Sequence, residues 1–99
     1  MRLSRQLTER EKTLEKSLKR RVKAIGGMCL KLVTIHISGL PDRLLLLPRG
    51  VAIFVEVKET KKKPSPIQNY MIKKLKKLGF PVHVVDSTYV IDEILKDYE

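Results

Sequence analysis

The chain has 99 residues, so we expect one domain with one modest core over residues 1–99, with a flexible start at residues 1–7. Its 21 Lys and Arg against 11 Asp and Glu give a net charge of +10, which favours a polyanionic partner such as nucleic acid. The single cysteine, Cys29, excludes an intrachain disulfide and cysteine–histidine zinc sites, and no segment is apolar enough for a signal peptide or a membrane span.

The first predicted element is a helix over residues 8–25, because leucine, valine and isoleucine recur there at helical spacing. Thr8 and Glu11 have the spacing of a capping box, and Gly26-Gly27 ends the helix. Residues 28–37 are rich in β-branched side chains and predict the first strand.

Two further strands are predicted over residues 42–47 and 51–58, joined by the short hairpin loop Pro48-Arg49-Gly50. Their apolar runs are nearly continuous, which is typical of strands that are covered on both faces.

The second half of the chain alternates helix and strand. A charged loop over residues 59–64 precedes a helix that starts at Ser65-Pro66 and ends at Gly79. A fourth strand over residues 80–85 and a last helix over residues 88–95 follow. The apolar stripe expected on the middle helix consists of Ile67, Met71, Leu75 and Leu78.

The order of the elements predicts the fold class. The third strand, the middle helix and the fourth strand form a right-handed crossover unit, which makes these two strands parallel. The first helix can then cover the opposite face. We therefore expect an α/β fold with a mixed central sheet flanked by helices.

Three charged residues lie at one end of the predicted hairpin. Asp42 opens one apolar strand, and Glu56 and Lys58 close the next, with both side chains on one face. Carboxylates and carbonyl oxygens are the ligands that magnesium prefers, so Asp42, Glu56 and the backbone carbonyl of Val57 predict a site for Mg²⁺ or Mn²⁺. Lys58 could orient a water or stabilise negative charge in phosphodiester hydrolysis.

A structural interpretation of the same residues stands beside the catalytic one. Asp42 can cap a turn after Pro41, and Glu56 and Lys58 can be a solvated strand end. The pattern is short enough to occur by chance, so its weight comes from the apolar strand before Glu56 and from the basic charge of the chain.

Six motifs follow one another in the chain: Gly26-Gly27, Lys31, Gly39-x-Pro41-Asp42-Arg43, Phe54-Val55-Glu56-Val57-Lys58, Pro64-Ser65-Pro66-x-Gln68 and Leu78-Gly79-Phe80-x-Val82. In this combination, from about residue 11 to the last helix, the sequence resembles the PD-(D/E)xK nuclease superfamily. More narrowly, it is similar to the virus-type replication-repair nuclease (VRR-Nuc) domains, and its short length resembles their stand-alone phage members. The resemblance implies a restriction-endonuclease-like αβββαβ core.

The resemblance also implies residue roles. Asp42 and Glu56 correspond to the metal ligands of the family, and Lys58 corresponds to its catalytic lysine. The family places a further acid on the first helix, for which we favour Glu15, while Glu11 stays open as the alternative. Gln68 matches a glutamine of the family, although Ser65 and Gln68 also have the spacing of a capping box.

Basic residues near the predicted site are candidates for phosphate contact, since the low aromatic content of 5% favours backbone contact over base stacking. The charged face of the middle helix is interpreted as solvated. The candidates for nucleic-acid binding are Arg43, Lys61, Lys62, Lys63, Lys19 and Lys23.

The predicted function is a Mg²⁺- or Mn²⁺-dependent DNA endonuclease without an organic cofactor or a membrane partner, in the cytosol of a bacterial host if it is phage-encoded. By resemblance to stand-alone family members, we expect it to resolve four-way (Holliday) junctions. One site per chain then requires a two-fold symmetric homodimer. The alternatives are a non-catalytic nucleic-acid-binding module on a nuclease-like scaffold, and a nicking or restriction-type nuclease.

Overall fold

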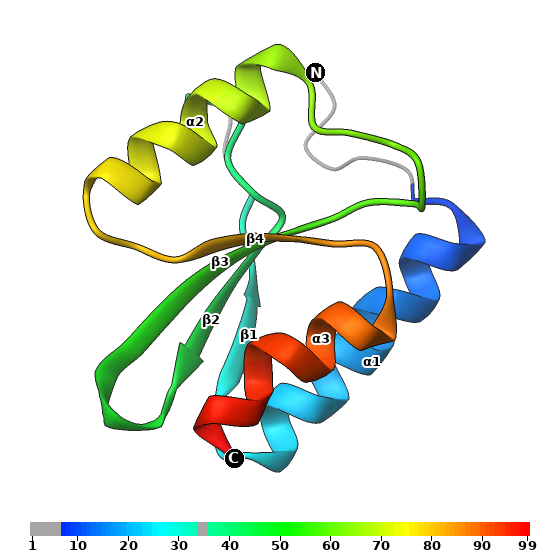
Figure 1. Cartoon of the computed structure of the whole chain (residues 1–99), viewed down its shortest axis with the longest axis vertical. Helices are drawn as coiled ribbons and strands as arrows, with labels where there is room; N and C mark the ends of the chain where they lie inside the picture. Colours follow the sequence, from blue (N-terminus) through cyan, green and yellow to red (C-terminus); the bar gives the residue numbers. More distant parts are fainter. Residues whose placement is uncertain (1–6, 34–35) are drawn as a thin grey trace.

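The computed structural model describes residues 7–33 and 36–99, which form a four-stranded sheet with helices on both faces (Figure 1). No described helix is long and apolar enough to cross a membrane. Of the start that we expected to be flexible, only Leu7 lies within the described residues. The elements in chain order are α1 (Glu9–Ala24), β1 (Met28–Lys31), β2 (Arg43–Leu47), β3 (Val51–Val57), α2 (Pro66–Lys77), β4 (Val82–Val85) and α3 (Thr88–Leu95), with short 3-10 turns at Pro48–Gly50 and Lys96–Tyr98.

The sheet has the strand order β1-β2-β3-β4. β1 and β2 are antiparallel, β2 and β3 form the predicted antiparallel hairpin, and β3 and β4 are parallel across the α2 crossover. The register places Arg43 opposite Val55 and Glu56 opposite Val84. This arrangement confirms the predicted α/β class and the mixed sheet.

One face of the sheet carries the main core. α1 and α3 lie together on this face (Figure 1), and their apolar stripes pack against alternate residues of β2, β3 and β4. Alternation along a strand sends every second side chain to the same face, so this packing uses the odd-numbered positions of β2 and β3. The fully buried side chains of this core include Leu18, Val22, Leu45, Ile53, Val55, Val57, Val85, Ile91 and Leu95.

Among the helices that the structure describes, α2 is the one that covers the opposite face. Ile72 and Leu75 of α2 pack on Val82, with Phe54 and Leu40 partly buried beside them. The predicted stripe of α2 was wrong in part, because Ile67 and Leu78 are exposed and Ile72 is buried instead. A single helix over a sheet buries only a narrow stripe, so the residues at the two ends of α2 reach beyond it.

β1 is shorter than predicted. Strand geometry ends at Lys31 and not at residue 37, although the Leu32 amide still donates to the Asp42 carbonyl. Residues 36–39 form bends, and residues 34–35 lie outside the described residues. The early end is consistent with β2 starting at Arg43, because Pro41, two residues before that start, has no amide hydrogen to donate to a ladder.

Candidate active site

The end of the β2–β3 hairpin brings Asp42 to β3. Asp42 directly precedes β2, and the Arg43–Val55 register places it opposite Glu56. Its carboxylate oxygen Oδ2 accepts a hydrogen bond of 3.1 Å from the Val57 amide. The amide and the carbonyl of one strand residue point to the same edge, so the Val57 carbonyl also lies on the Asp42 side of β3.

Glu56 lies at the centre of the polar cluster. Its side chain is fully buried, and its oxygen Oε2 lies 3.3 Å from the Lys58 ammonium nitrogen and 3.1 Å from the Gln68 amide nitrogen. Burial of a carboxylate is costly unless charge and hydrogen bonds compensate it, and Lys58 and Gln68 supply both. The structure thus brings together the three residues that the sequence predicted on β3 and α2.

Gln68 forms the predicted capping box and also contacts Glu56. The Ser65 hydroxyl accepts a hydrogen bond from the Gln68 backbone amide at 3.3 Å, and the Gln68 side-chain oxygen accepts one from the Ser65 backbone amide at 2.9 Å. This reciprocal capping box fixes the first turn of α2. With its side-chain oxygen held at the cap, the Gln68 NH₂ group is directed to Glu56.

Gly39 fixes the approach of the chain to Asp42. Its φ of +83° is a left-handed conformation that favours glycine. A Cβ at this position would lie 2.6 Å from the carbonyl oxygen of Ile67, in the first turn of α2. The segment before β2 therefore touches the start of α2 at a point where only a glycine fits.

The first helix contributes Glu11 to the carboxyl end of β3. Glu11 is buried, and its oxygen Oε2 accepts from the Glu59 amide at 3.1 Å, one residue beyond Lys58. Its other oxygen accepts from the Thr8 amide at 3.2 Å in the predicted capping box. Glu11, the alternative candidate for the helix acid, thus adjoins the chain just after β3.

Glu15 and Arg43 contact each other. We expected Glu15 at the metal site and Arg43 on a phosphate, and in the structure the two side chains form a buried ion pair with each other. The Arg43 Nε lies 2.7 Å from a Glu15 oxygen, and Nη2 contacts the same oxygen. The pair lies on the α1 face of the sheet, because Arg43 alternates with the core residues Leu45 and Leu47.

A signal in the sequence could have found this pair. Arg43 stands at the inward position of a strand whose other inward residues are leucines, and Glu15 adjoins Leu14 and Leu18 of the inner helix stripe. A buried charge needs a partner of opposite sign, so two such inward charges on packed elements predict each other.

The donors at the polar cluster fit a magnesium-like ion. Carboxylate and carbonyl oxygens from Asp42, Glu56 and Val57 lie at one end of β3, and such oxygens are the ligands that Mg²⁺ and Mn²⁺ take. Within residues 7–33 and 36–99, however, no three His, Cys, Asp or Glu side chains gather closely enough to form a metal site by themselves. Magnesium usually keeps several waters, so two carboxylates and a carbonyl suffice for it.

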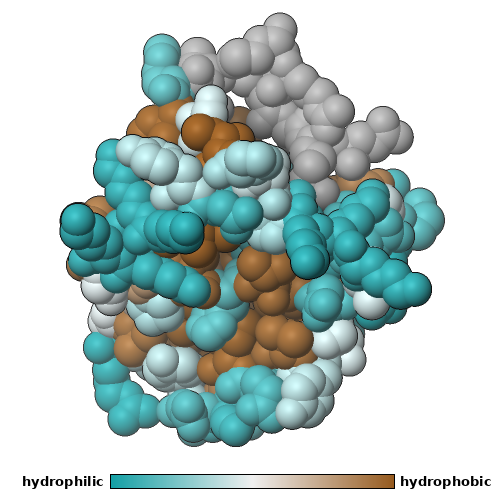
Figure 2. All heavy atoms as spheres, turned by 45° about the horizontal axis from the view of Figure 1, so that its top comes forward, coloured by the Kyte–Doolittle hydropathy of each residue, from teal (hydrophilic) through white to brown (hydrophobic). Residues whose placement is uncertain are grey.

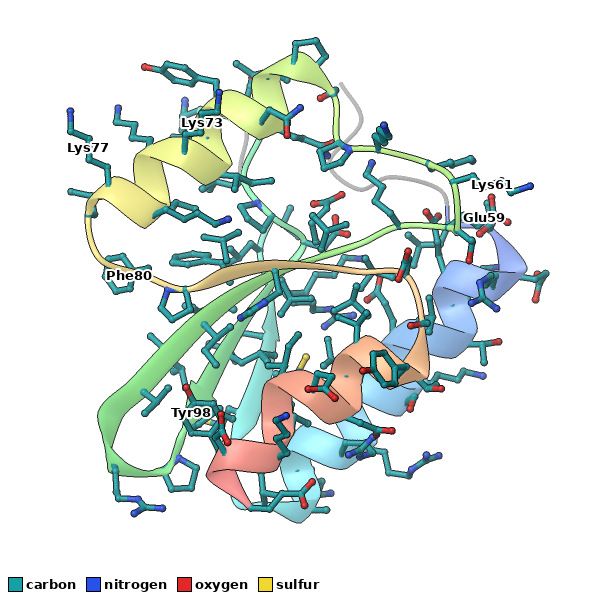
Figure 3. All side chains as sticks on the ribbon, in the orientation of Figure 1. Glu59, Lys61, Lys73, Lys77, Phe80 and Tyr98 are labelled. Atoms are coloured by element: carbon teal, nitrogen blue, oxygen red, sulfur yellow. The ribbon has the colours of Figure 1, made fainter. Side chains whose placement is uncertain are left out.

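The five lysines predicted to contact phosphate divide into two groups. Lys61, Lys62 and Lys63 are exposed on the loop between Lys58 and α2, where Lys61 points away from the fold and Lys62 pairs with Glu59 at 3.3 Å (Figure 3). Lys19 and Lys23 are exposed on the last turns of α1, beside Met28 and Cys29 at the β1 edge. A rise of ~1.5 Å per residue puts Lys23 about 18 Å along the helix from Glu11, so α1 leads these lysines away from the cluster.

Comparisons with known proteins agree with this geometry. Residues 2–89 match the VRR-NUC domain. This chain belongs to the VRR-NUC family. It is 45% identical over 78 residues to the "Putative nuclease p44" of Acyrthosiphon pisum secondary endosymbiont phage 1, a match that covers 79% of this chain and 84% of the phage protein. A solved structure described as a VRR_NUC domain superposes with a TM-score of 0.85 at 39% identity, covering 93% of this chain and all of the solved one.

Family membership confirms the predicted resemblance and fold, and it makes this VRR-NUC chain a nuclease domain.

Burial raises the pKa of the Cys29 thiol, so a thiolate nucleophile is disfavoured in this VRR-NUC domain. The polar cluster around Glu56 is the candidate active site.

Proposed function

We propose that this VRR-NUC domain is a Mg²⁺- or Mn²⁺-dependent endonuclease that hydrolyses phosphodiester bonds in branched DNA. The observation that carries the proposal is the fully buried Glu56 carboxylate, which meets Lys58 and Gln68 beside Asp42. A nuclease family and a net charge of +10 support DNA as the substrate.

The bound metal would supply charge neutralisation at the phosphate and a water of lowered pKa. Asp42, Glu56 and the Val57 carbonyl are the residues of this chain that would hold it. The Val57 amide fixes the Asp42 carboxylate, and Gln68 fixes the Glu56 carboxylate, so the two acids are held in place before a substrate arrives.

Lys58 is the group of this site that acts on the reacting atoms. Its ammonium nitrogen sits 3.3 Å from Glu56, on a strand end whose amide is bonded to the Val85 carbonyl at 2.9 Å. From there it can orient the attacking water and stabilise the negative charge that develops on the phosphate oxygens. The water oxygen bonds to phosphorus and releases a proton to solvent, one phosphorus–oxygen ester bond breaks, and the leaving sugar oxygen takes up a proton from solvent.

Paired cleavage of a four-way junction requires two such sites, and we propose a two-fold symmetric homodimer. The half of the sheet that α2 leaves uncovered offers an apolar surface for it. Met28 and Leu46, which pair across β1 and β2, are 57% and 38% exposed on that half. Apolar side chains of this size on neighbouring strands mark a surface suited to a second copy.

Cleavage of labelled four-way junction, flap and linear duplex in Mg²⁺ or Mn²⁺ tests the proposal. We expect Asp42→Asn and Lys58→Ala to lose activity by about 100-fold or more, as for removal of a charge-stabilising group, while junction binding is retained. Asp97→Asn and Lys16→Ala, which are exposed and outside the cluster, are matched controls that keep activity. Full activity of either cluster variant would refute the assignment.

Two measurements separate the remaining alternatives. Calorimetric titration with Mn²⁺ should show binding in the wild type that Glu56→Gln removes. Absence of metal binding and cleavage, with salt-sensitive DNA affinity, would identify a non-catalytic binding module instead. Light scattering should give twice the 11.4 kDa chain mass, and a monomer would count against paired cleavage.

A further inference from the structure

The outer face of α2 carries a basic and apolar stripe. Five residues at helical spacing, three and four apart, line one depression of about 670 Å³: Tyr70, Lys73, Lys74, Lys77 and Leu78. The side chains of Lys73 and Lys77 point away from the sheet (Figure 3). We name these five residues the α2 stripe.

The apolar members of the α2 stripe are unusually exposed. Tyr70 is 59% exposed and Leu78 is 69% exposed, although α2 already buries Ile72 and Leu75 on its opposite side. The helix therefore has a second apolar face that the fold does not use. Figure 2, in which the side of the molecule that carries α2 comes forward, shows hydrophobic patches interspersed with hydrophilic side chains.

Charge decides which partner suits the α2 stripe. The helix Pro66–Lys77 has four lysines and no acidic residue, so no ion pair within the helix neutralises them. A second copy of the chain placed on this face by a two-fold axis would bring like charges together, which is unfavourable. A polyanion is complementary to this face, and it gains from release of its counterions.

The α2 stripe lies on the helix that also carries Gln68, but on its outer side. Gln68 contacts Glu56 on the sheet-facing side, and Tyr70, two residues on, is turned by about 200° around the helix axis. The helix with its side chains is about 10–12 Å across, so DNA that enters the site over the first turn of α2 can also contact Lys73 and Lys77 on the outer side.

We propose that the α2 stripe binds the DNA arm next to the scissile phosphate, with its lysines on backbone phosphates and the Tyr70 ring against a base exposed where pairing is interrupted. The proposal rests on the proposed nuclease function. It replaces the expectation that the charged face of this helix is only solvated. Through Tyr70 it also assigns a residue that distinguishes branched DNA from continuous duplex.

DNA binding measured in EDTA over a salt series tests the lysines without cleavage. Each phosphate contact contributes about −0.9 to the slope of log affinity against log salt, so Lys73→Gln/Lys77→Gln should make the slope less steep by about 1 to 2. The matched control is Lys16→Gln/Arg20→Gln, two exposed positions one turn apart on α1. An unchanged slope in the α2 variant, or the same change in the control, would overturn the proposal.

A second pair of variants, Tyr70→Ala and a control, tests Tyr70. Because Tyr70→Ala removes one ring–base contact, it should weaken binding to four-way junction or flap by about tenfold and leave binding to linear duplex nearly unaffected. Tyr89→Ala is the control, because Tyr89 is similarly exposed on α3, on the other face of the sheet. An equal loss on all substrates, or none, would overturn the role of Tyr70, provided that thermal unfolding shows a folded variant.

The outcomes are separable from those of the nuclease proposal. If Lys58→Ala abolishes cleavage and the salt slope is unaffected by the α2 variants, the nuclease function stands and the α2 stripe proposal fails. If the salt slope changes as expected but Lys58→Ala cleaves normally, the α2 stripe binds DNA and the proposed nuclease site fails. The last measurement is the affinity of the α2 variants for vesicles of anionic lipid. Weaker binding to vesicles with unchanged binding to DNA would identify a membrane-binding surface and overturn the proposal.

Discussion

The two faces of the sheet have different tasks, and β3 belongs to both. Ile53, Val55 and Val57 point into the core beneath α1 and α3, while Phe54 and Glu56 point to the α2 side. α1 and α3 lie over the first face and α2 lies over the second (Figure 1). We call the first the sealed face, because its core side chains are fully buried, and the second the open face, because apolar side chains of β1 and β2 are exposed on it. A strand with a period of two can therefore anchor a polar site without placing charge in the main core.

The buried ion pair is the exception on the sealed face, and breaking it should have the largest effect on stability. Arg43→Leu leaves the Glu15 carboxylate buried without its partner, which we expect to cost about 3–5 kcal/mol of unfolding free energy. The double variant Glu15→Leu/Arg43→Leu should recover most of this loss, because apolar replacement of a buried pair is often neutral. Urea unfolding of the two single variants and the double variant measures both effects.

The same double variant tests the role of Glu15. If Glu15 only pairs with Arg43, the double variant should cleave DNA like the wild type once its stability is recovered. Loss of cleavage in a folded double variant would restore Glu15 as the helix acid of the site. Glu11→Gln provides the comparison, since Glu11 holds the Glu59 amide beside Lys58.

Two neighbouring leucines of β2 compare the faces directly. Leu45 is fully buried on the sealed face, and Leu46 is exposed on the open one. Leu45→Ala should cost about 2–5 kcal/mol through lost burial and a cavity, whereas Leu46→Ala should cost under about 0.5 kcal/mol, as for surface positions. Equal costs in urea unfolding at low protein concentration would contradict the difference between the faces. A concentration-dependent cost at Leu46 would support its place in a dimer interface.

How much the sequence predicted depends on whether a feature is local. The capping boxes at Thr8 and Ser65 and the crossover at α2 follow from short-range patterns, and the structure confirms them. The meeting of Glu56, Lys58 and Gln68 was also accessible, because strand alternation and helix capping fix where these side chains point.

The features that sequence reasoning missed depend on how packed elements are rotated against each other. Glu11 and Glu15 lie one turn apart on the inner face of α1, and only its packing decides which one reaches β3. The rotation of α2 about its axis likewise exposes Ile67 and buries Ile72. When apolar residues occur on two faces of a helix, helical periodicity does not determine which face packs on the sheet. The end of β1 depends on where β2 begins, which is a non-local matter.

The smallest expected effect is a pH dependence at the edge of the sealed face. His83 lies on β4 opposite Val55, and burial together with the nearby Lys76 charge lowers the pKa of its imidazole. The unfolded chain, with an ordinary pKa of about 6.5, then binds the proton more readily than the folded one. The unfolding free energy should therefore be unaffected by His83 above pH 6.5 and decline slightly as the pH falls below it. Urea midpoints between pH 8 and 5.5 should show this decline in the wild type, and a parallel decline in His83→Gln would assign it to another group.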